Sequence, residues 1–215
     1  LTTGLGKSVE EIQKLSAKLG FNAEVREFTK NSVMATIAEV KKAPALSALL
    51  QTLSRDKDKY ISSHSMLVAH LACGLATKLE WVTDTTFQKL TLAAFLHDIS
   101  LKNHVLAKIS SLKELEYRAK EFTKEEIRAY KNHPMEGAKT AGTFDEVPPD
   151  VDTVIAQHHE RPNGQGFPRG LSHTRIAPIS TVFIVAHDLA QFILDQDSGG
   201  NPLSPENLKA FTEAN

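Results

Sequence analysis

The chain has 215 residues, 41% hydrophobic and 24% charged, and its 25 Lys and Arg nearly balance its 26 Asp and Glu. This composition is typical of a globular protein and argues against a disordered chain or a membrane bundle. The net charge of −1 argues against electrostatic binding to nucleic-acid polymers or to anionic lipid. The lone Cys73 excludes an intramolecular disulfide and fits a cytoplasmic protein, whereas nine histidines make a metal site the first hypothesis.

Apolar residues recur at helical spacing along almost the whole chain, which predicts an all-α protein. The first part of the chain predicts three helices. One opens at the capping box that begins at Ser8 and ends at Gly20, a second covers residues 31–41, and a third runs from Pro44 to about Leu53.

Residues 54–59 are polar and poor in apolar side chains, which favours a boundary there. We therefore expect residues 1–56 to form a helical N-terminal segment and residues 57–215 to form the main domain. The N-terminal segment is interpreted as an amphipathic packing element, with a connector or the remnant of a regulatory domain as alternatives.

The main domain predicts helices over residues 60–81 and 85–99, from Thr123 past His133, from Pro148 to His159, and over 178–193. Between the last two, residues 160–170 hold three Gly and two Pro, which indicates a shaped loop.

Each of these helices carries an ionisable side chain among apolar neighbours, against the rule that buried charge must be paired or coordinated. These groups are His64, His97, Asp98, His133, His158, His159 and Asp188. Any one of them alone is best explained as a hydrogen-bonded core residue. Together they need a common partner, and divalent metal accepts imidazole and carboxylate at once. Seven ligands exceed one octahedral shell once water is added, so two ions are expected, and whether His187 joins them stays open.

With these residues in order, the chain resembles the HD-GYP family, a branch of the HD superfamily of metal-dependent phosphohydrolases, from about Tyr60 to Ile193. Four stretches carry the resemblance. Residues 95–99 (F-L-H-D-I) resemble the L-H-D-I-G-K signature, and residues 132–137 (N-H-P-M-E-G) resemble H-P-x-x-G. Residues 158–168 (H-H-E-R-P-N-G-Q-G-F-P) resemble H-H-E-R-x-D-G-x-G-Y-P, and residues 178–193 resemble the closing helix of the family.

The resemblance implies a helical bundle around a buried di-metal site, with iron or manganese held by the seven residues named above. Aligning Pro178 with the family's proline places Asp188, rather than His187, at the ligand position. The implied activity is hydrolysis of cyclic di-GMP, in which Asp98 bridges both ions and orients the nucleophile. The implied substrate-binding residues are Arg161, Asn163, Gly164, Gly166, Phe167 and Pro168.

Several positions depart from the family pattern in ways that reduce the grip on phosphate. Leu101 replaces a lysine, and Leu67 and Val182 replace arginines, so charge-assisted hydrogen bonds are lost. Lys102, Arg161 and Arg169 lie close in sequence to these motifs, so they are candidates to compensate for the lost positive charges.

Three further departures alter the site. Asn163 replaces an aspartate and Phe167 replaces the tyrosine of G-Y-P, which removes its hydroxyl. Tyr60 stands where trimetal members of the family carry a glutamate, so a third metal is not expected.

Two functions follow from these residues. The first is a divergent bacterial phosphodiesterase with weak or altered catalysis on a cyclic dinucleotide or another small phosphoester. The alternative is a catalytically impaired, metal-bound module that binds a nucleotide or a signalling protein partner. A different nucleotide hydrolase of the HD superfamily is disfavoured by His133, by the pair His158–His159 and by the Gly-Phe-Pro stretch.

Overall fold

The computed structural model describes residues 2–41, 50, 59–79, 83–144, 147–196 and 203–214. Within these ranges the chain forms α-helices, short 3₁₀ turns and loops, and its one β contact is an isolated bridge between Asn163 and Ser172. The all-α prediction is confirmed for the described part of the chain.

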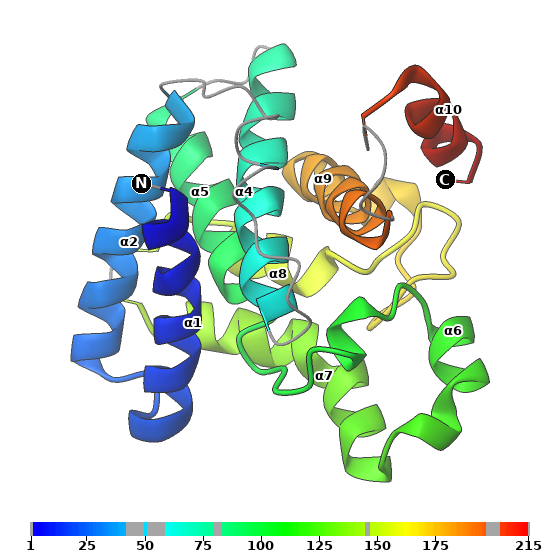
Figure 1. The fold of residues 1–215 in the computed structure, drawn as a ribbon, viewed down its shortest axis with the longest axis horizontal. Coiled ribbons are helices and arrows are strands. Elements are labelled where there is room, and N and C mark those ends of the chain that lie inside the picture. The colour runs from blue at the N-terminus through cyan, green and yellow to red at the C-terminus, as the bar shows by residue number, and fades with distance from the viewer. Residues whose placement is uncertain are drawn as a thin grey trace.

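The N-terminal helices pack onto the main domain instead of standing apart from it. Helices α1 (Thr2–Leu19) and α2 (Ala23–Lys41) lie side by side at one edge of the molecule (Figure 1). They contact α4 (Tyr60–Lys78) and α5 (Asp84–Leu96), respectively. Buried side chains from all four helices share one hydrophobic core, as expected of an amphipathic packing element. The predicted helix from Pro44 to Leu53 and the predicted boundary fall almost wholly outside the described residues.

The starts of the first two helices differ from the sequence predictions. Helix α1 begins at Thr2, so the S-x-x-E spacing of Ser8 lies within the helix and does not cap it. Helix α2 begins at Ala23 because the Asn22 side chain accepts a hydrogen bond from the Val25 backbone N–H at 3.0 Å, as an N-cap does. The predicted stop at Gly20 is confirmed, with Gly20 in the left-handed region at φ +68°.

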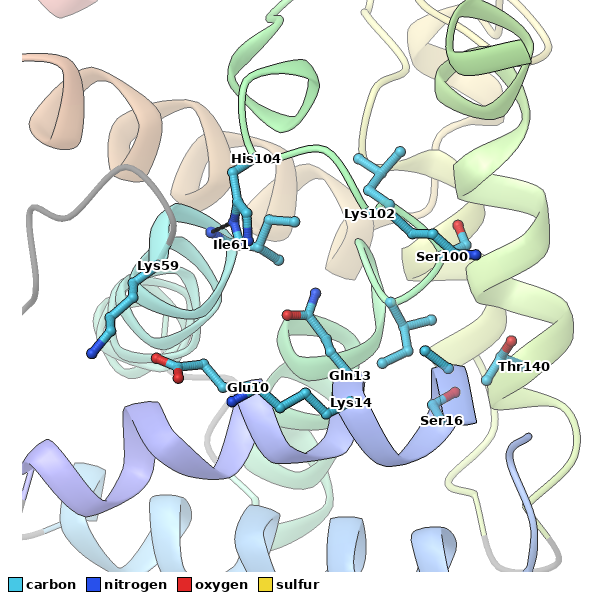
Figure 2. A pocket seen from close by; sticks show the side chains of 13 residues that line it. Glu10, Gln13, Lys14, Ser16, Lys59, Ile61, Ser100, Lys102, His104 and Thr140 are labelled. Carbon is cyan, nitrogen blue, oxygen red and sulfur yellow. Dashed lines mark hydrogen bonds between the residues drawn. The ribbon is translucent and has the colours of Figure 1, made fainter. Parts of the chain in front are cut away.

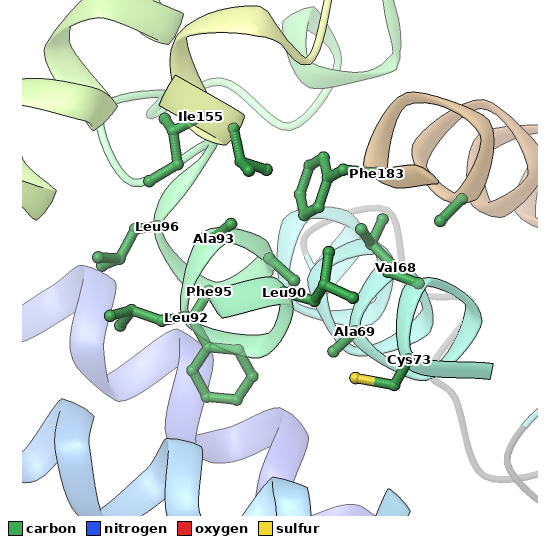
Figure 3. Packing of buried hydrophobic residues seen from close by; sticks show 14 of the residues in the cluster. Val68, Ala69, Cys73, Leu90, Leu92, Ala93, Phe95, Leu96, Ile155 and Phe183 are labelled. Atoms are coloured by element: carbon green, nitrogen blue, oxygen red, sulfur yellow. The ribbon is translucent and has the colours of Figure 1, made fainter. Parts of the chain in front are cut away.

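The centre of the molecule is built from α4, α5, α8 (Val151–Gln157) and α9 (Pro178–Asp195). Figure 3 shows Val68, Leu90 and Phe183, from three of these helices, meeting in the core. By length and composition α9 could cross a membrane, but half of that stretch is buried against the other helices, so it is a core helix.

The remaining elements surround this centre. They are the 3₁₀ turns η2 (Leu106–Lys108), η3 (Ala119–Glu121) and η4 (His173–Arg175) and the helices α6 (Leu112–Tyr117), α7 (Lys124–Ala141) and α10 (Pro205–Ala214). The predicted capping box at the start of α7 is confirmed, since Thr123 and Glu126 exchange both side chain to backbone hydrogen bonds.

Helix α7 approaches the end of α5 closely, and this contact leaves little room for a side chain at position 137. A Cβ atom on Gly137 would lie 3.0 Å from the backbone oxygens of Leu96 and His97. The glycine of the H-P-x-x-G stretch therefore lets α7 bring His133 up to the end of α5, where His97 lies.

Candidate metal centre

Six buried histidines from five elements converge in two groups of three. The first group is His64, His97 and His187, and the second is His133, His158 and His159; within each group one nitrogen per residue lies within 4.8 Å of the others. Five of these six histidines are among the predicted ligands, and the sixth is His187. The helices thus bring together residues up to 123 positions apart, from His64 to His187.

The backbone orients three of these rings in the same way. The Nδ1 atoms of His97, His133 and His158 lie 2.9, 2.5 and 2.6 Å from the carbonyl oxygens of the residues three positions earlier. A carbonyl only accepts, so each Nδ1 carries the proton and each Nε2 presents a lone pair. This is the tautomer that a metal ligand requires.

Several nitrogens of the cluster have no hydrogen-bond partner although they are buried. They are both ring nitrogens of His64, Nε2 of His97 and Nδ1 of His159. Leaving buried polar atoms unsatisfied costs about 1–3 kcal/mol each, so such a cluster needs a partner that accepts lone pairs. A divalent ion in each group fits this requirement.

Burial also keeps several of these imidazoles neutral. It lowers the pKa of His64, His158 and His159 well below the usual value of the side chain, and the other histidines of the cluster lower it further. Burial lowers the pKa of His133 to about 4. Neutral imidazole is the form that binds metal, so the cluster is poised for coordination at neutral pH.

The Asp98 carboxylate lies between the two groups of histidines. Its Oδ2 atom is 3.3 Å from Nε2 of His97, in the first group, and its Oδ1 atom is 3.4 Å from Nε2 of His133, in the second. Burial raises the pKa of Asp98, but the surrounding histidines outweigh this and hold the pKa well below its usual value. A buried carboxylate with one oxygen toward each group is placed to bridge two ions.

The structure places His187 within the cluster and Asp188 beside it, so His187 becomes a ligand candidate next to the predicted Asp188. His187 is 3% exposed and follows Phe183 by one helical turn on the buried face of α9. The Asp188 carboxylate instead lies 2.9 Å from Nη2 of Arg161 and 3.3 Å from Nδ1 of His187. The helical period of α9 marks His187 as a residue that faces the core, because Phe183, Ala186, His187 and Ala190 lie on one buried face of the helix.

The loop after α8 is folded around the buried Glu160, a residue that the sequence analysis did not single out. Its carboxylate accepts hydrogen bonds from the backbone N–H groups of Arg169 and Leu171, both at 2.7 Å. At Gly166 a Cβ atom would lie 2.3 Å from the Arg161 nitrogen, so only glycine fits. Glu160 and Gly166 together close this loop against the histidines.

The predicted substrate-binding residues divide into two sets. Phe167 is buried and its ring stacks on His159, with centroids 4.5 Å apart and planes at 15°, while the backbone of Pro168 follows through a cis peptide bond. Arg161 is partly buried beside Asp188. By contrast, Asn163 is exposed, and its Oδ1 atom accepts a hydrogen bond from the Gln165 backbone. Gly164, at φ +75°, turns the loop there.

The positions that lack a basic residue are filled by buried apolar side chains. Leu67 is 0%, Leu101 4% and Val182 6% exposed. Leu101 packs in a small cluster with Tyr60, Ile61 and Phe167, among others. The charges that the family pattern places there are therefore replaced by packing, and any phosphate contact must come from elsewhere.

Several cavities lie outside the buried cluster, and two of them bear on phosphate binding. The larger, about 660 Å³, lies between α1, the start of α4 and the loop after Asp98, and contains Lys14, Lys59 and Lys102 (Figure 2). The smaller, about 400 Å³, is lined by residues of α9 together with Lys108 and Arg161. Lys102 and Arg161, both candidates to compensate for the lost charges, thus lie in different cavities, whereas Arg169 is exposed on the loop.

Acidification is expected to destabilise the metal-free protein between pH 6.5 and about 4. The pKa of His133 is about 4 in the folded protein, against 6.5 in the unfolded chain, so the unfolded chain binds more protons in this range. The free energy of unfolding therefore falls as pH falls, by roughly 3 kcal/mol from His133 alone. Urea unfolding of chelator-treated protein at several pH values measures this; a midpoint that does not change between pH 6.5 and 4.5 contradicts it.

Comparisons with known proteins agree with this geometry. A family model described as "HD domain" matches residues 33–204. Cyclic di-GMP phosphodiesterase PA4108 of Pseudomonas aeruginosa is 31% identical over 126 residues, which are 57% of this chain but only 28% of that protein. Among solved structures, Bd1817, an HDG"Y"P protein from Bdellovibrio bacteriovorus, matches with a TM-score of 0.65 and 27% identity over 88% of this chain and 59% of that one.

The family match covers most of the chain and includes every histidine of the cluster. The paired His97–Asp98, the convergent histidines and the all-helical bundle are the features that the resemblance predicted. The chain therefore belongs to the HD domain family and is a divergent HD-GYP-like member of it.

Proposed function

We propose that this chain is a di-metal phosphodiesterase-like protein that acts on a cyclic dinucleotide. The observation that carries the proposal is the position of Asp98, whose two oxygens lie 3.3 and 3.4 Å from histidines of different groups. One carboxylate between two buried groups of three imidazoles is the donor set for two neighbouring ions.

The ligands that we propose are Asp98 and the six clustered histidines, with His187 in the place that the sequence analysis assigned to Asp188. Six imidazoles and one carboxylate form a nitrogen-rich set that suits iron better than manganese, which prefers oxygen ligands. Two ions in such a site supply a nucleophile at neutral pH and stabilise the charge that develops on a phosphodiester.

The residues of the chain itself orient the histidine ligands and exclude water from the site. The carbonyl groups behind His97, His133 and His158 hold the rings in one tautomer. Phe167, stacked on His159, covers one side of the cluster and keeps it dry. Charge interactions are stronger in such a water-excluded site than at the surface.

The substrate class is supported by the relative in Pseudomonas aeruginosa, which is named a cyclic di-GMP phosphodiesterase. This chain spans 28% of that protein's length, so the shared part is its HD-type domain and not the whole molecule. A phosphodiester between two nucleosides is the bond that the proposed centre would cleave.

A second candidate function is a metal-bound module that binds the nucleotide, or a signalling protein, with little or no turnover. Buried apolar side chains at Leu67, Leu101 and Val182 favour it, because each lost charged hydrogen bond is worth about 1.5–3 kcal/mol.

We expect the iron-loaded protein to convert cyclic di-GMP slowly to a linear dinucleotide, and chelation to abolish this conversion. Chromatography of the products, alongside metal analysis of the same sample, measures both. Conversion that persists after the metal has been removed would sink the proposal. Metal-bound protein that binds cyclic di-GMP without converting it would instead establish the second function.

A further inference from the structure

The cavity of about 400 Å³ beside α9 borders the metal centre on its His187 side. Asp188, Gln191 and Asp195, one helical turn apart, line it along α9. The connection to the cluster is direct, since Oδ1 of Asp188 is 3.3 Å from Nδ1 of His187. A molecule in this cavity would therefore lie next to the first group of histidines.

Arg161 is held in this cavity by two contacts. Its Nη2 atom donates to Oδ1 of Asp188 at 2.9 Å, and its Nη1 atom donates to the Glu160 carbonyl at 3.0 Å. Glu160 is itself fixed by the loop that it closes. A guanidinium fixed on two sides is preorganised, and its remaining N–H groups are available to an oxyanion.

Lys108 is a second cation in the cavity, and its ammonium group lies over the Tyr60 ring. Its Nζ atom lies 4.8 Å from the centre of the Tyr60 ring, which stacks on His64 with centroids 5.6 Å apart. The Gln191 side chain donates to the Lys108 carbonyl at 2.5 Å and thereby fixes the backbone of η2 against α9. Among the described residues no carboxylate forms an ion pair with this ammonium group, but Asp195 interacts with its charge, and Glu114 lines the cavity together with Asp188 and Asp195.

Tyr60 contacts both a residue of the cavity and the first group of histidines. Its ring lies 4.8 Å from the Lys108 ammonium and stacks on His64. Its hydroxyl is buried and has no hydrogen-bond partner among the described residues, although Tyr60 itself does not line the cavity.

We propose that Lys108 and Arg161 bind the phosphate of the substrate in this cavity, in place of the basic residues that Leu67, Leu101 and Val182 displaced. This inference rests on the proposed function, because it takes the substrate to be a phosphodiester at the adjoining metal centre. Lys108 supplies a point charge and Arg161 a planar fork, which together suit the two free oxygens of a phosphodiester. The lysine that contacts the phosphate thus lies in the 3₁₀ turn η2 and not at position 101, in the loop before it.

Lys102 is a matched control for Lys108. It lies six residues earlier on the same connection, carries the same charge, and lines the other cavity, near α1 (Figure 2). Replacing either lysine by glutamine changes the net charge equally, so a difference between the two variants reports position and not charge.

The experiment measures equilibrium binding of the bisphosphorothioate analogue of cyclic di-GMP, which resists hydrolysis, to the iron-loaded full chain by calorimetry. We expect Lys108→Gln to weaken binding by roughly tenfold to a hundredfold, the loss of one charge-assisted hydrogen bond. Lys108→Arg is expected to restore most of the affinity, and Lys102→Gln to leave it unchanged. Metal analysis of each variant should show the wild-type content.

Equal affinities of Lys108→Gln and Lys102→Gln overturn the inference, as does a natural chain that does not bind the analogue. Weak binding by a Lys108→Gln protein that has also lost its metal counts against it too, since Lys108 would then be structural. Binding that depends on Lys108 without any turnover of cyclic di-GMP contradicts hydrolysis but leaves the phosphate site standing. Turnover that is indifferent to Lys108 overturns this inference alone.

Discussion

Asp98→Asn is expected to remove both metal ions together and to abolish any metal-dependent phosphodiesterase activity. The reason is geometric: the two oxygens of Asp98 lie 3.3 and 3.4 Å from histidines of the two groups, so one amide would replace a ligand of both ions. Metal analysis should fall from about two ions per chain to few or none. The matched control, Asp152→Asn on the exposed side of α8, should retain its metal.

The same variant separates loss of metal from loss of fold. In the metal-free protein the surrounding histidines favour the ionised form of Asp98, so a neutral amide at this position should lower the free energy of unfolding. We expect the metal-free variant to fold but to unfold at a lower temperature than the metal-free natural chain, and added metal to stabilise only the natural chain. An Asp98→Asn protein that keeps two ions would refute the bridging role.

His187→Asn and Asp188→Asn are expected to behave differently, although the residues are neighbours. His187 is 3% exposed and belongs to the first group of histidines, so its loss should leave about one ion per chain, held by the second group. Asp188 is paired with Arg161 at 2.9 Å, so its replacement should leave both ions in place. Metal analysis and metal-dependent thermal stability measure the difference.

The opposite result, with metal lost from Asp188→Asn and retained by His187→Asn, would restore the assignment made by aligning Pro178. Loss of one ion from both variants would show that the pair acts together through their 3.3 Å contact. A double variant then distinguishes the two cases, because independent ligands lose metal additively and coupled ligands do not.

The sequence by itself determined the helical class and the identity of most of the candidate ligands. Helical periodicity places His64 and His97 among apolar neighbours, and the short motifs around His133 and His158 mark these two histidines as candidate ligands. These signals are local, since a helix and the first turn of a loop are specified by residues a few positions apart. The beginnings of α1 and α2 differ from the prediction because an S-x-x-E spacing also fits a helix interior and because Asn22 caps α2.

Only the tertiary structure decided which groups meet. One residue along a helix rotates the side chain by about 100°, so a shift of a single position separates His187, inside the cluster, from Asp188, beside Arg161. Likewise Lys102 and Lys108 are equivalent as sequence, yet the turn η2 between α5 and α6 directs them into different cavities. The sequence specifies the periodicity of each helix, but the choice of neighbours depends on how α4, α7, α8 and α9 pack, and that packing is what assembles the site.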